Sequence, residues 1–283
     1  MWHTLTELVE QGDTYLFLLP VYALLLSGER LAHGWLRSEP WNNKDTAVNI
    51  LITVAQLALN LVGGHLVPLG LMAVLYAQCS LFSLDTTAGW IAAFLLYDLA
   101  WYIDHRIAHR VSLFWSMHHV HHSSEEYNMT VASRGFVFDV TLLSRPTFYI
   151  LPILGISPFQ FILISILTNI WGIAQHTRLV SRLPVLDFVF ATPSNHRVHH
   201  GTNPKYIDRN YGEVLILWDR LFGTYQREEE EPTYGVIQPI HSYNPLWVQV
   251  AGLARLAKKL RQNNGLLQKF RCLIRPPEWK SPS

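Results

Sequence analysis

Charged residues are scarce in this chain of 283 residues: 15% are Asp, Glu, Lys or Arg, whereas 49% are hydrophobic. Two long stretches, residues 46–84 and 146–177, contain no charged residue at all. A membrane-spanning helix needs about 20 predominantly apolar residues, so the first stretch is long enough for two crossings. Shorter apolar segments cover residues 15–27 and 86–103. The chain is therefore expected to be a polytopic membrane protein.

Several other signatures are lacking. The two cysteines, Cys79 and Cys272, lie far apart and form no CxxC, which excludes a disulfide framework or an iron–sulfur ligand set. Residues 1–13 carry three acidic residues and no Lys or Arg, so a cleaved signal peptide is not expected. There is no GxGxxG-type nucleotide loop and no nucleic-acid signature. Any electrons that the protein uses must come from a separate partner.

Histidine, in contrast, is abundant and concentrated. Ten of the fourteen histidines lie between residues 104 and 201, and nine of these recur at helical spacings. The nine are His105-x3-His109, His118-x2-His121-His122, a lone His176, and His196-x2-His199-His200. Residues three and four apart share a helix face, so each cluster is expected to direct its imidazoles toward a common point. Imidazole suits iron, zinc, copper or nickel, and nine ligands are too many for one ion. The pattern predicts a two-metal site.

A purely structural interpretation has to be weighed against this one. A lone histidine such as His176 is usually a hydrogen-bonded core residue, and a single HxxHH can arise in a polar turn. Recurrence of the motif favours ligation, because burying unpaired polar side chains is costly. His119 lies about 100° around the helix from its neighbour on the ligand stripe, and it is left out of the predicted ligand set.

Four carboxylates are candidates for hydrogen bonds that orient the ligand imidazoles: Asp98, Glu125, Glu126 and Asp208. Asp98 lies in an apolar segment seven residues before His105, and an acid within a membrane usually faces the protein interior. The alternative interpretations are an acid at the membrane interface for Asp98 and plain surface charges for the other three.

Basic residues are distributed unevenly along the chain. They flank the histidine clusters and recur between residues 255 and 275, where they alternate with leucines. The tail has the pattern of a basic amphipathic helix at an anionic membrane surface, although a solvated helix is the alternative. Because cytoplasmic segments of membrane proteins are enriched in Lys and Arg, the metal site is expected to face the cytoplasm.

The blocks around the histidines carry a family resemblance. DHRIAH, MHHVHHSSEEYN and SNHRVHHG, followed by DRNYG and WDRLFGTY, resemble the fatty acid hydroxylase/sterol desaturase superfamily from about Tyr97 to Tyr225. HHSSEEYN and NHRVHHG…WDRLFGT are most similar to its alkylglycerol monooxygenase-like branch, which includes bacterial members. The resemblance implies a histidine-held di-iron centre that uses O2 to hydroxylate or desaturate a C–H bond of a lipid. The implied ligands are His105, His109, His118, His121, His122, His176, His196, His199 and His200.

The same resemblance implies the partners. The substrate would be a fatty acyl, alkyl-ether or sterol-like membrane lipid, O2 the co-substrate, and the electron donor a reductase, ferredoxin, cytochrome or tetrahydropterin. A multi-pass location in the bacterial inner membrane or the endoplasmic reticulum is expected, with the lipid bilayer as surroundings and no nucleic acid.

Two positions depart from the family pattern. Arg110 stands where the alkylglycerol monooxygenase-like branch has a glutamate, which weighs against ether-lipid cleavage and a tetrahydropterin donor. Val180 stands where several lipid hydroxylases have a second histidine. A water or another group is therefore expected to complete the shell of one metal.

The expected organisation is one all-α domain over residues 1–283, with membrane helices under a cytoplasmic helical cap that holds the di-metal site. The membrane helices occupy residues 1–103. The catalytic histidine region spans residues 104–225 and includes a Pro- and Gly-interrupted membrane hairpin at 136–178. A polar segment and the basic amphipathic tail make up residues 226–283.

Three other activities are compatible with a histidine cluster. A desaturase would use the same di-iron site but remove a second hydrogen, and only the product distinguishes it from a hydroxylase. A metal transporter would embed its ligands within several spans, whereas these histidines gather at predicted helix ends. A zinc-dependent membrane lipid hydrolase would make no use of O2, because zinc is redox-inert.

Overall fold

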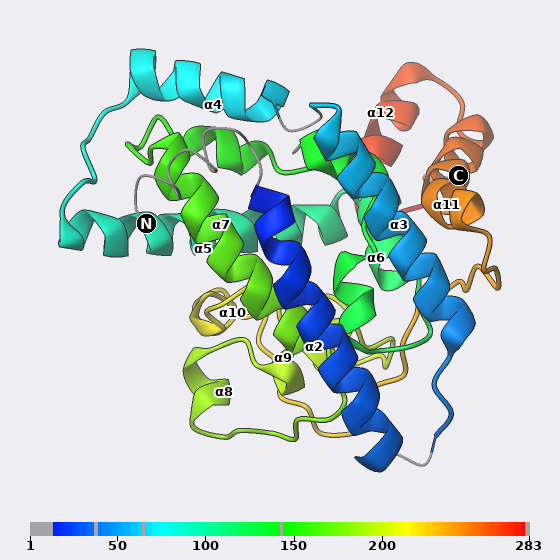
Figure 1. Ribbon diagram of the computed structural model, residues 1–283. Helices are drawn as coiled ribbons and strands as arrows, with labels where there is room; N and C mark the ends of the chain where they lie inside the picture. The colour runs from blue at the N-terminus through cyan, green and yellow to red at the C-terminus, as the bar shows by residue number, and fades with distance from the viewer. Residues whose placement is uncertain (1–13, 37–38, 64–65, 142–143, 281–283) are drawn as a thin grey trace.

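The computed structural model describes residues 14–36, 39–63, 66–141 and 144–280, and regular structure there is helical (Figure 1). The α-helices are α2 (Thr14–Leu36), α3 (Asn43–Leu61), α4 (Leu66–Cys79), α5 (Thr87–Arg110), α6 (Ser112–His122), α7 (Pro158–Gln175), α8 (Leu186–Val189), α9 (Pro193–His199), α10 (Leu217–Leu221), α11 (Pro245–Gln262) and α12 (Leu266–Ile274). The 3-10 helices are η1 (Met129–Ser133), η2 (Val137–Thr141) and η3 (Pro146–Ile150). The described residues form two isolated β-bridges and no strand, which confirms the predicted all-α class. Residues 1–13 of the predicted N-terminal membrane region lie outside the described ranges.

Polar side chains mark where the long helices begin. Asn42 caps α3 and Thr86 caps α5, each by accepting a backbone N–H three residues further on. Ser157 and Gln160 form a capping box at the start of α7, with Pro158 in its first turn. The position of α7 along the chain is thereby fixed, and its C-terminal end falls at the lone histidine of the predicted ligand set.

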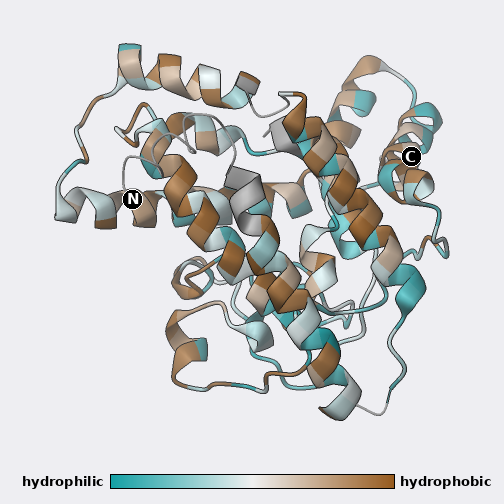
Figure 2. Ribbon diagram, viewed as in Figure 1, coloured by the Kyte–Doolittle hydropathy of each residue, from teal (hydrophilic) through white to brown (hydrophobic). Residues whose placement is uncertain are grey.

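The membrane-spanning regions expected from the sequence correspond to helices of differing character. Among the described residues, α7 is the one helix that is long and apolar enough to cross a membrane, and Val67–Cys79 is a shorter apolar helix. The charge-free stretch at residues 46–84 contains α3 and α4, both rich in apolar residues (Figure 2). Helix α4 has only 14 residues, fewer than a crossing needs. A multi-pass arrangement therefore remains a prediction.

The predicted hairpin at residues 136–178 has two unlike arms. Its first arm is made of the short helices η2 and η3 followed by turns, and its second arm is the continuous helix α7. Gly155, with a φ of +98°, allows the reversal between the arms, and a Cβ there would lie 2.3 Å from the backbone oxygen of Phe82. The prolines and glycines that suggested a hairpin thus divide its first arm into single turns.

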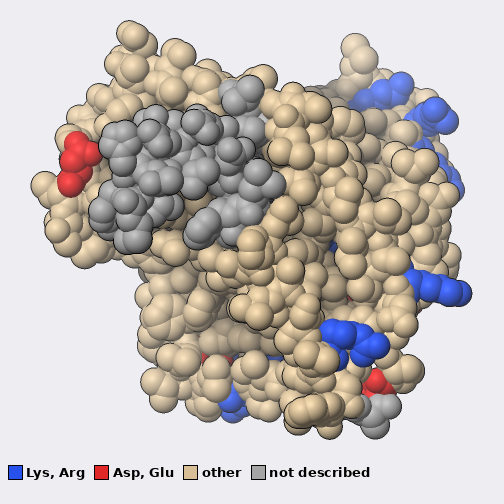
Figure 3. Space-filling view, viewed as in Figure 1, with Lys and Arg blue, Asp and Glu red and all other residues tan. Residues whose placement is uncertain are grey.

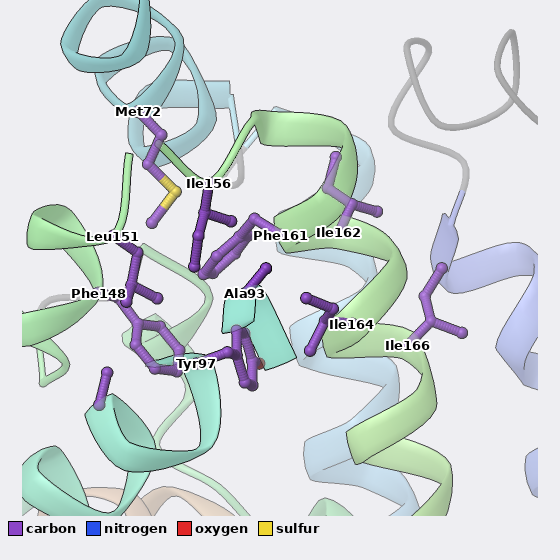
Figure 4. Packing of buried hydrophobic residues seen from close by; sticks show 11 residues of the cluster. Met72, Ala93, Tyr97, Phe148, Leu151, Ile156, Phe161, Ile162, Ile164 and Ile166 are labelled. Atoms are coloured by element: carbon purple, nitrogen blue, oxygen red, sulfur yellow. The ribbon is translucent and has the colours of Figure 1, made fainter. Parts of the chain in front are cut away.

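The main hydrophobic core lies between α5, η3 and α7 (Figure 4). The Tyr97 ring packs against Phe148 at 4.9 Å and Phe161 at 5.4 Å between centroids. Helix α4 adds Met72 at the edge of this cluster. The core holds α5 and α7 together, and both helices carry histidines at their C-terminal ends.

Helix α6 is fixed between several elements. Val111 is extended, with φ −123° and ψ 114°, and turns the chain between α5 and α6. Helix α11 also packs on α6, and a Cβ on Gly252 would lie 2.2 Å from the Ser116 carbonyl oxygen. Only glycine permits so close an approach. The histidine cluster of α6 is thereby held against those of α5.

A buried arginine joins the end of α6 to α3. Arg134 is 2% exposed and pairs with Asp45 at 3.1 Å. Its Nη1 also donates to Asn49 Oδ1 at 2.8 Å, and its Nε donates to Ser123 Oγ at 3.1 Å and to the Val120 carbonyl at 3.2 Å. An ion pair buried in this way is costly to break, because one charge is then left without its partner.

We expect Arg134→Met to destabilise the fold by about 3–5 kcal/mol, since it leaves the Asp45 carboxylate buried and uncompensated. The free energy of unfolding, measured by denaturant titration in detergent micelles, provides the comparison. The matched control is Arg182→Met, because Arg182 lies nearer the surface and its pair with Asp187 is 3.9 Å long. A double variant that also carries Asp45→Leu should recover much of the loss. Equal stability of the Arg134 and Arg182 variants would contradict the structural role of Arg134.

Candidate metal centre

Four helices bring the nine predicted histidines to one place. Helix α5 contributes from its last two turns, α6 from its C-terminal half, α7 from the residue after its end, and α9 from its length and its end. Seven of the nine are buried and the other two, His118 and His121, are partly buried. In chain order they are His105, His109, His118, His121, His122, His176, His196, His199 and His200.

The nine side chains divide into two groups, each of which can hold a metal ion. The first group is His105, His109, His118, His122 and His199, and the second is His121, His176, His196 and His200. Within each group the potential ligand nitrogens all lie within 4.8 Å of one another. The groups are adjacent, because the rings of His122 and His200, one from each group, stack at 4.4 Å between centroids.

The membership of the groups corrects one sequence-based expectation. Each HxxHH motif was expected to aim its histidines at a single point, yet both motifs divide between the groups. In α6 the outer pair, His118 and His122, joins the first group and His121 joins the second. The reason is helical geometry: residues four apart are offset by about 40° around the axis, whereas His121 and His122 are about 100° apart. The motif around α9 divides in the opposite sense, since His199 joins the first group.

Spacings between nitrogens match those around a metal ion. Nε2 of His118 lies 3.1 Å from Nε2 of His105 and 3.2 Å from Nε2 of His122. In the second group, Nε2 of His176 lies 3.1 Å from that of His196 and 3.4 Å from that of His121. Two imidazole nitrogens bound at about 2.1 Å to one ion, at 90–110° to each other, would be roughly 3.0–3.4 Å apart.

Three further ring nitrogens support the same interpretation. Nε2 of His109, His199 and His200 is buried and has no hydrogen-bond partner among the described residues. Buried polar atoms in native proteins are almost always satisfied, so an unsatisfied set at one point requires an explanation. A metal ion would supply the missing partner, and the donor set fits one.

Burial keeps these imidazoles in the form that binds metal. Desolvation lowers the pKa of His118, His122 and His199 well below the ordinary value, and neighbouring imidazoles add to the effect. Desolvation does the same to the pKa of His200. The rings are therefore neutral at physiological pH, and neutral imidazole is the form that ligates.

Backbone carbonyl groups fix the orientation of three rings. Nδ1 of His105 donates to the Tyr211 carbonyl at 2.8 Å, and Nδ1 of His199 donates to the Arg209 carbonyl at 3.0 Å. Nδ1 of His176 donates to the Gly172 carbonyl at 2.7 Å. Because a carbonyl can only accept, each Nδ1 carries the proton and each Nε2 is left with a free lone pair. Such contacts hold metal-ligating histidines in one tautomer.

The segment that provides two of these carbonyls is itself held by buried carboxylates. Asp219 accepts from the backbone N–H groups of Tyr211 and Gly212, both at 2.8 Å. Asp98 accepts from the N–H groups of Val214 at 2.9 Å and Leu215 at 3.1 Å. Its Oδ2 also accepts from the indole N–H of Trp218 at 2.9 Å. The two carboxylates therefore set the position of residues 211–218.

Asp98 thus acts on the backbone segment beside the histidines and not, as the sequence suggested it would, on a histidine ring. It was expected to accept a ring N–H from a ligand histidine, but the groups that donate to it lie in the segment 214–218. Its side chain is fully buried, as an acid that faces the protein interior should be. The predicted partner of Asp98 was wrong because the segment 214–218 offers N–H donors that satisfy both of its carboxylate oxygens.

The other three predicted acids differ among themselves. Asp208 lies beside the cluster: its Oδ1 is 3.6 Å from Nδ1 of His109, and its Oδ2 accepts from Arg110. Glu126 accepts from the side chain of Asn42 at 3.1 Å, and Glu125 lies 3.6 Å from His241 near the surface. The prediction that these two glutamates contact ligand histidines is therefore corrected, because their side chains contact Asn42 and His241, which lie outside both histidine groups.

Sequence reasoning missed several residues beside the cluster. Asp219 lies in the WDRLFGTY block, but the sequence does not indicate its donors, which are backbone groups seven and eight residues before it. Glu213 is 5% exposed and lies against Gly172, where a Cβ would be 2.8 Å from its Oε1. Burial raises the pKa of Glu213 to about 8. Tyr127 stacks on the ring of His176 at 5.6 Å. Each contact joins residues that are distant in sequence, apart from the first.

The structure also accounts for the residues left out of the ligand set. His119 lies outside both groups, and its Nε2 accepts from Nη1 of Arg255 at 2.8 Å. The second group has four histidines against five in the first. The expectation, drawn from Val180, that a water or another group completes the shell of one metal stays a prediction. His65 and His3 lie outside the described residues.

The described part of the chain is helical and carries two histidine groups that could each hold a metal ion, and comparison with known proteins gives its class. Residues 90–224 match the fatty acid hydroxylase family. The chain belongs to the fatty acid hydroxylase/sterol desaturase superfamily. No solved structure matches it.

Three relatives illustrate the range of that superfamily. Human alkylglycerol monooxygenase (Homo sapiens) is 36% identical over 199 residues, which are 69% of this chain and 43% of the relative. Ornithine lipid hydroxylase OlsE of Rhizobium tropici is 30% identical over 139 residues, 48% of this chain and 41% of the relative. The Delta(7)-sterol 5(6)-desaturase of Candida glabrata is 28% identical over 142 residues, 49% of this chain and 36% of the relative. The chain spans less than half the length of these relatives.

The outer carboxylates generate a prediction about metal affinity. Asp219→Ala removes the acceptor of the Tyr211 N–H group, so the carbonyl that orients His105 loses its position. We expect metal affinity to fall by about 10–100-fold, as it does for other partners of metal ligands. Competition with a chelator in detergent measures the change. Asp85→Ala is the control, because Asp85 accepts from Ser83 in an exposed loop away from the site. Unchanged affinity in a folded Asp219 variant would contradict this role.

Proposed function

We propose that the protein is a membrane di-iron oxygenase that hydroxylates a C–H bond of a lipid. The observation that carries the proposal is the pair of adjacent histidine groups, both contributed by residues 105–200, with ring nitrogens at metal-ligand spacings. All nine histidines lie within residues 90–224, the segment that matches the fatty acid hydroxylase family. Imidazole is a suitable ligand for iron, and the nine histidines would be its protein ligands.

The chain's own residues would supply the framework of the reaction. The nine histidines would hold two irons, and the carbonyls of Gly172, Arg209 and Tyr211 would keep three of the ligands in register. Iron, when bound, supplies the redox chemistry that activates O2. Overall, one oxygen atom enters the C–H bond of the lipid and the other leaves as water, with two electrons and two protons from outside.

The electrons would come from a separate donor. No nucleotide-binding or iron–sulfur motif is present in the sequence. A reductase, ferredoxin, cytochrome or tetrahydropterin would fill this role. The Arg110 side chain, which differs from the glutamate of the alkylglycerol monooxygenase-like branch, pairs with Asp208 beside the site. It favours a donor other than tetrahydropterin.

The proposed substrate is a membrane lipid with a fatty acyl, alkyl-ether or sterol-like chain. The three relatives are named for an alkylglycerol, an ornithine lipid and a sterol. We infer that residues 1–283 form one multi-pass domain, with membrane helices in residues 1–103 and the histidine region at the cytoplasmic boundary. The location would be the bacterial inner membrane or the endoplasmic reticulum. There a lipid could keep its tail in the bilayer while its reactive carbon reaches the metals.

Desaturation is the second candidate activity. The similarity to a Delta(7)-sterol 5(6)-desaturase favours it, since the same superfamily contains both outcomes. A desaturated product is two hydrogens lighter than the substrate, whereas a hydroxylated product is one oxygen heavier, so the product mass decides.

Metal content and O2 uptake test the class of enzyme. We expect protein purified in detergent from iron-replete cells to carry two irons per chain and to consume O2 only after reduction. Inductively coupled plasma mass spectrometry and an oxygen electrode give the two readings. Two zinc ions per chain with no O2 uptake would instead establish the zinc-dependent lipid hydrolase.

Variants in α6 and α9 test the assignment of ligands. We expect His122→Ala, in the first group, and His196→Ala, in the second, each to lower bound iron and abolish O2 uptake while membrane insertion is kept. His119→Gln is the matched control, since His119 is buried on the same helix but outside both groups. Wild-type iron content in either alanine variant would remove that histidine from the ligand set.

A further inference from the structure

Helix α12 displays apolar side chains to its surroundings. Leu266 is 87% exposed, Leu267 60%, Phe270 56% and Ile274 46%. At about 100° per residue these four lie within one stripe along the helix, and Leu273 falls at its edge. A helix of nine residues with an exposed stripe of this kind has no cover from the described part of the chain.

The opposite side of α12 faces the protein. Cys272 has no exposed surface and lies on the side of the helix away from the apolar stripe. Lys269 and Arg271 project on either side of the stripe, one at each border. The apolar stripe therefore points outward between one cation on each side, which is the arrangement of a helix that lies in a lipid interface.

The charge of the whole tail is of one sign. Residues 245–275 contain seven Lys and Arg residues and no Asp or Glu. Lys and Arg side chains gather along the edge of the molecule over α11 and α12 (Figure 3). The first turns of α11 also carry exposed apolar residues, Leu246, Trp247 and Val250. A surface both apolar and uniformly cationic complements anionic lipid headgroups above acyl chains.

The tail is connected directly to a helix of the metal centre. The carbonyl of Arg275, just after α12, accepts from the backbone N–H of Ser112 at 2.9 Å and from its hydroxyl at 2.8 Å. Ser112 is the first residue of α6. Close packing of Gly252 on Ser116 joins α11 to the same helix. A membrane surface that binds the tail would therefore also fix the position of α6 and its histidines relative to the bilayer.

We propose that α12 lies in the headgroup region of an anionic lipid leaflet, with Leu266, Leu267, Phe270 and Ile274 among the acyl chains and Lys269 and Arg271 at the phosphates. This inference rests on the membrane location in the proposed function. Its consequence is that lipid charge, acting through α12, helps to set the position of α6 relative to the bilayer.

A fluorescent label on the apolar stripe tests the docking. The full chain with Leu267→Cys in a Cys79→Ser background, which leaves Cys272 buried, is labelled with an environment-sensitive dye and reconstituted sparsely into vesicles. We expect blue-shifted emission in phosphatidylcholine vesicles containing phosphatidylglycerol, quenched more by nitroxide near the lipid glycerol than at the chain end. Gln262→Cys, exposed at the end of α11, is the control site and should keep the emission of a water-exposed dye.

Charge and crowding distinguish the occupants of this surface. Adding Lys269→Gln and Arg271→Gln should lower the ratio of docked to free α12 by about fivefold per cation in the anionic vesicles, and should change nothing in phosphatidylcholine alone. Water-like emission at residue 267 in both vesicles would overturn the proposal. A blue shift of the dye emission that increases with protein density and does not depend on lipid charge would also overturn the proposal. It would assign the surface to a second copy of the chain. Iron content and O2 uptake are read separately, so failure here is distinguishable from failure of the proposed function.

Discussion

Nine imidazoles can be packed together inside a protein only if nearly all of them are neutral, and this constraint organises the rest of the structure. Seven of the nine side chains are buried, with the other two partly buried. Two protonated rings would repel each other strongly at distances such as the 4.8 Å between the ring centroids of His109 and His199, in a medium of low dielectric constant. Desolvation suppresses protonation, as the lowered pKa of His122 and His199 indicates. A cation at each centre would then balance ring dipoles that otherwise face one another unsatisfied.

Neutral rings must also be held in one orientation and tautomer, and the protein does this with backbone carbonyl oxygens more than with carboxylates. Each carbonyl fixes the proton on Nδ1 without adding a full negative charge beside the metal. The carboxylates of Asp98 and Asp219 act on the backbone that carries or adjoins those carbonyls. Asp208 is the exception, because it lies directly beside His109. The charge of the centre is thus left to the metals, and the acids stabilise the framework around it.

Some of this was predictable and some was not, for physical reasons. The spacing of the histidines predicted the helices and the convergence of the clusters, because three- and four-residue intervals have a fixed meaning on a helix. The same helical geometry explains why each HxxHH motif divides between the two adjacent histidine groups. The role of Asp98 was hidden, since its partners begin 116 residues further along the chain. Glu125 and Glu126 lie close to the histidines in sequence, but their side chains contact His241 and Asn42 and not the ligand rings. The relation between the two arms of the 136–178 hairpin was equally hidden, because prolines indicate interruption without showing which arm keeps a long helix.

Helix α6 explains why elements so far apart in the chain are needed for one site. It supplies three of the nine histidines, yet it has only 11 residues and would be marginal as a helix alone. Arg134 ties its end to α3, Gly252 brings α11 against its flank, and Arg275 accepts from its first residue. The positions of its histidine rings therefore depend on segments that lie both before and after α6 in the chain. A rigid support of this kind is what a centre with two metals requires, because an error of a few tenths of an ångström in one helix would misplace ligands of both ions.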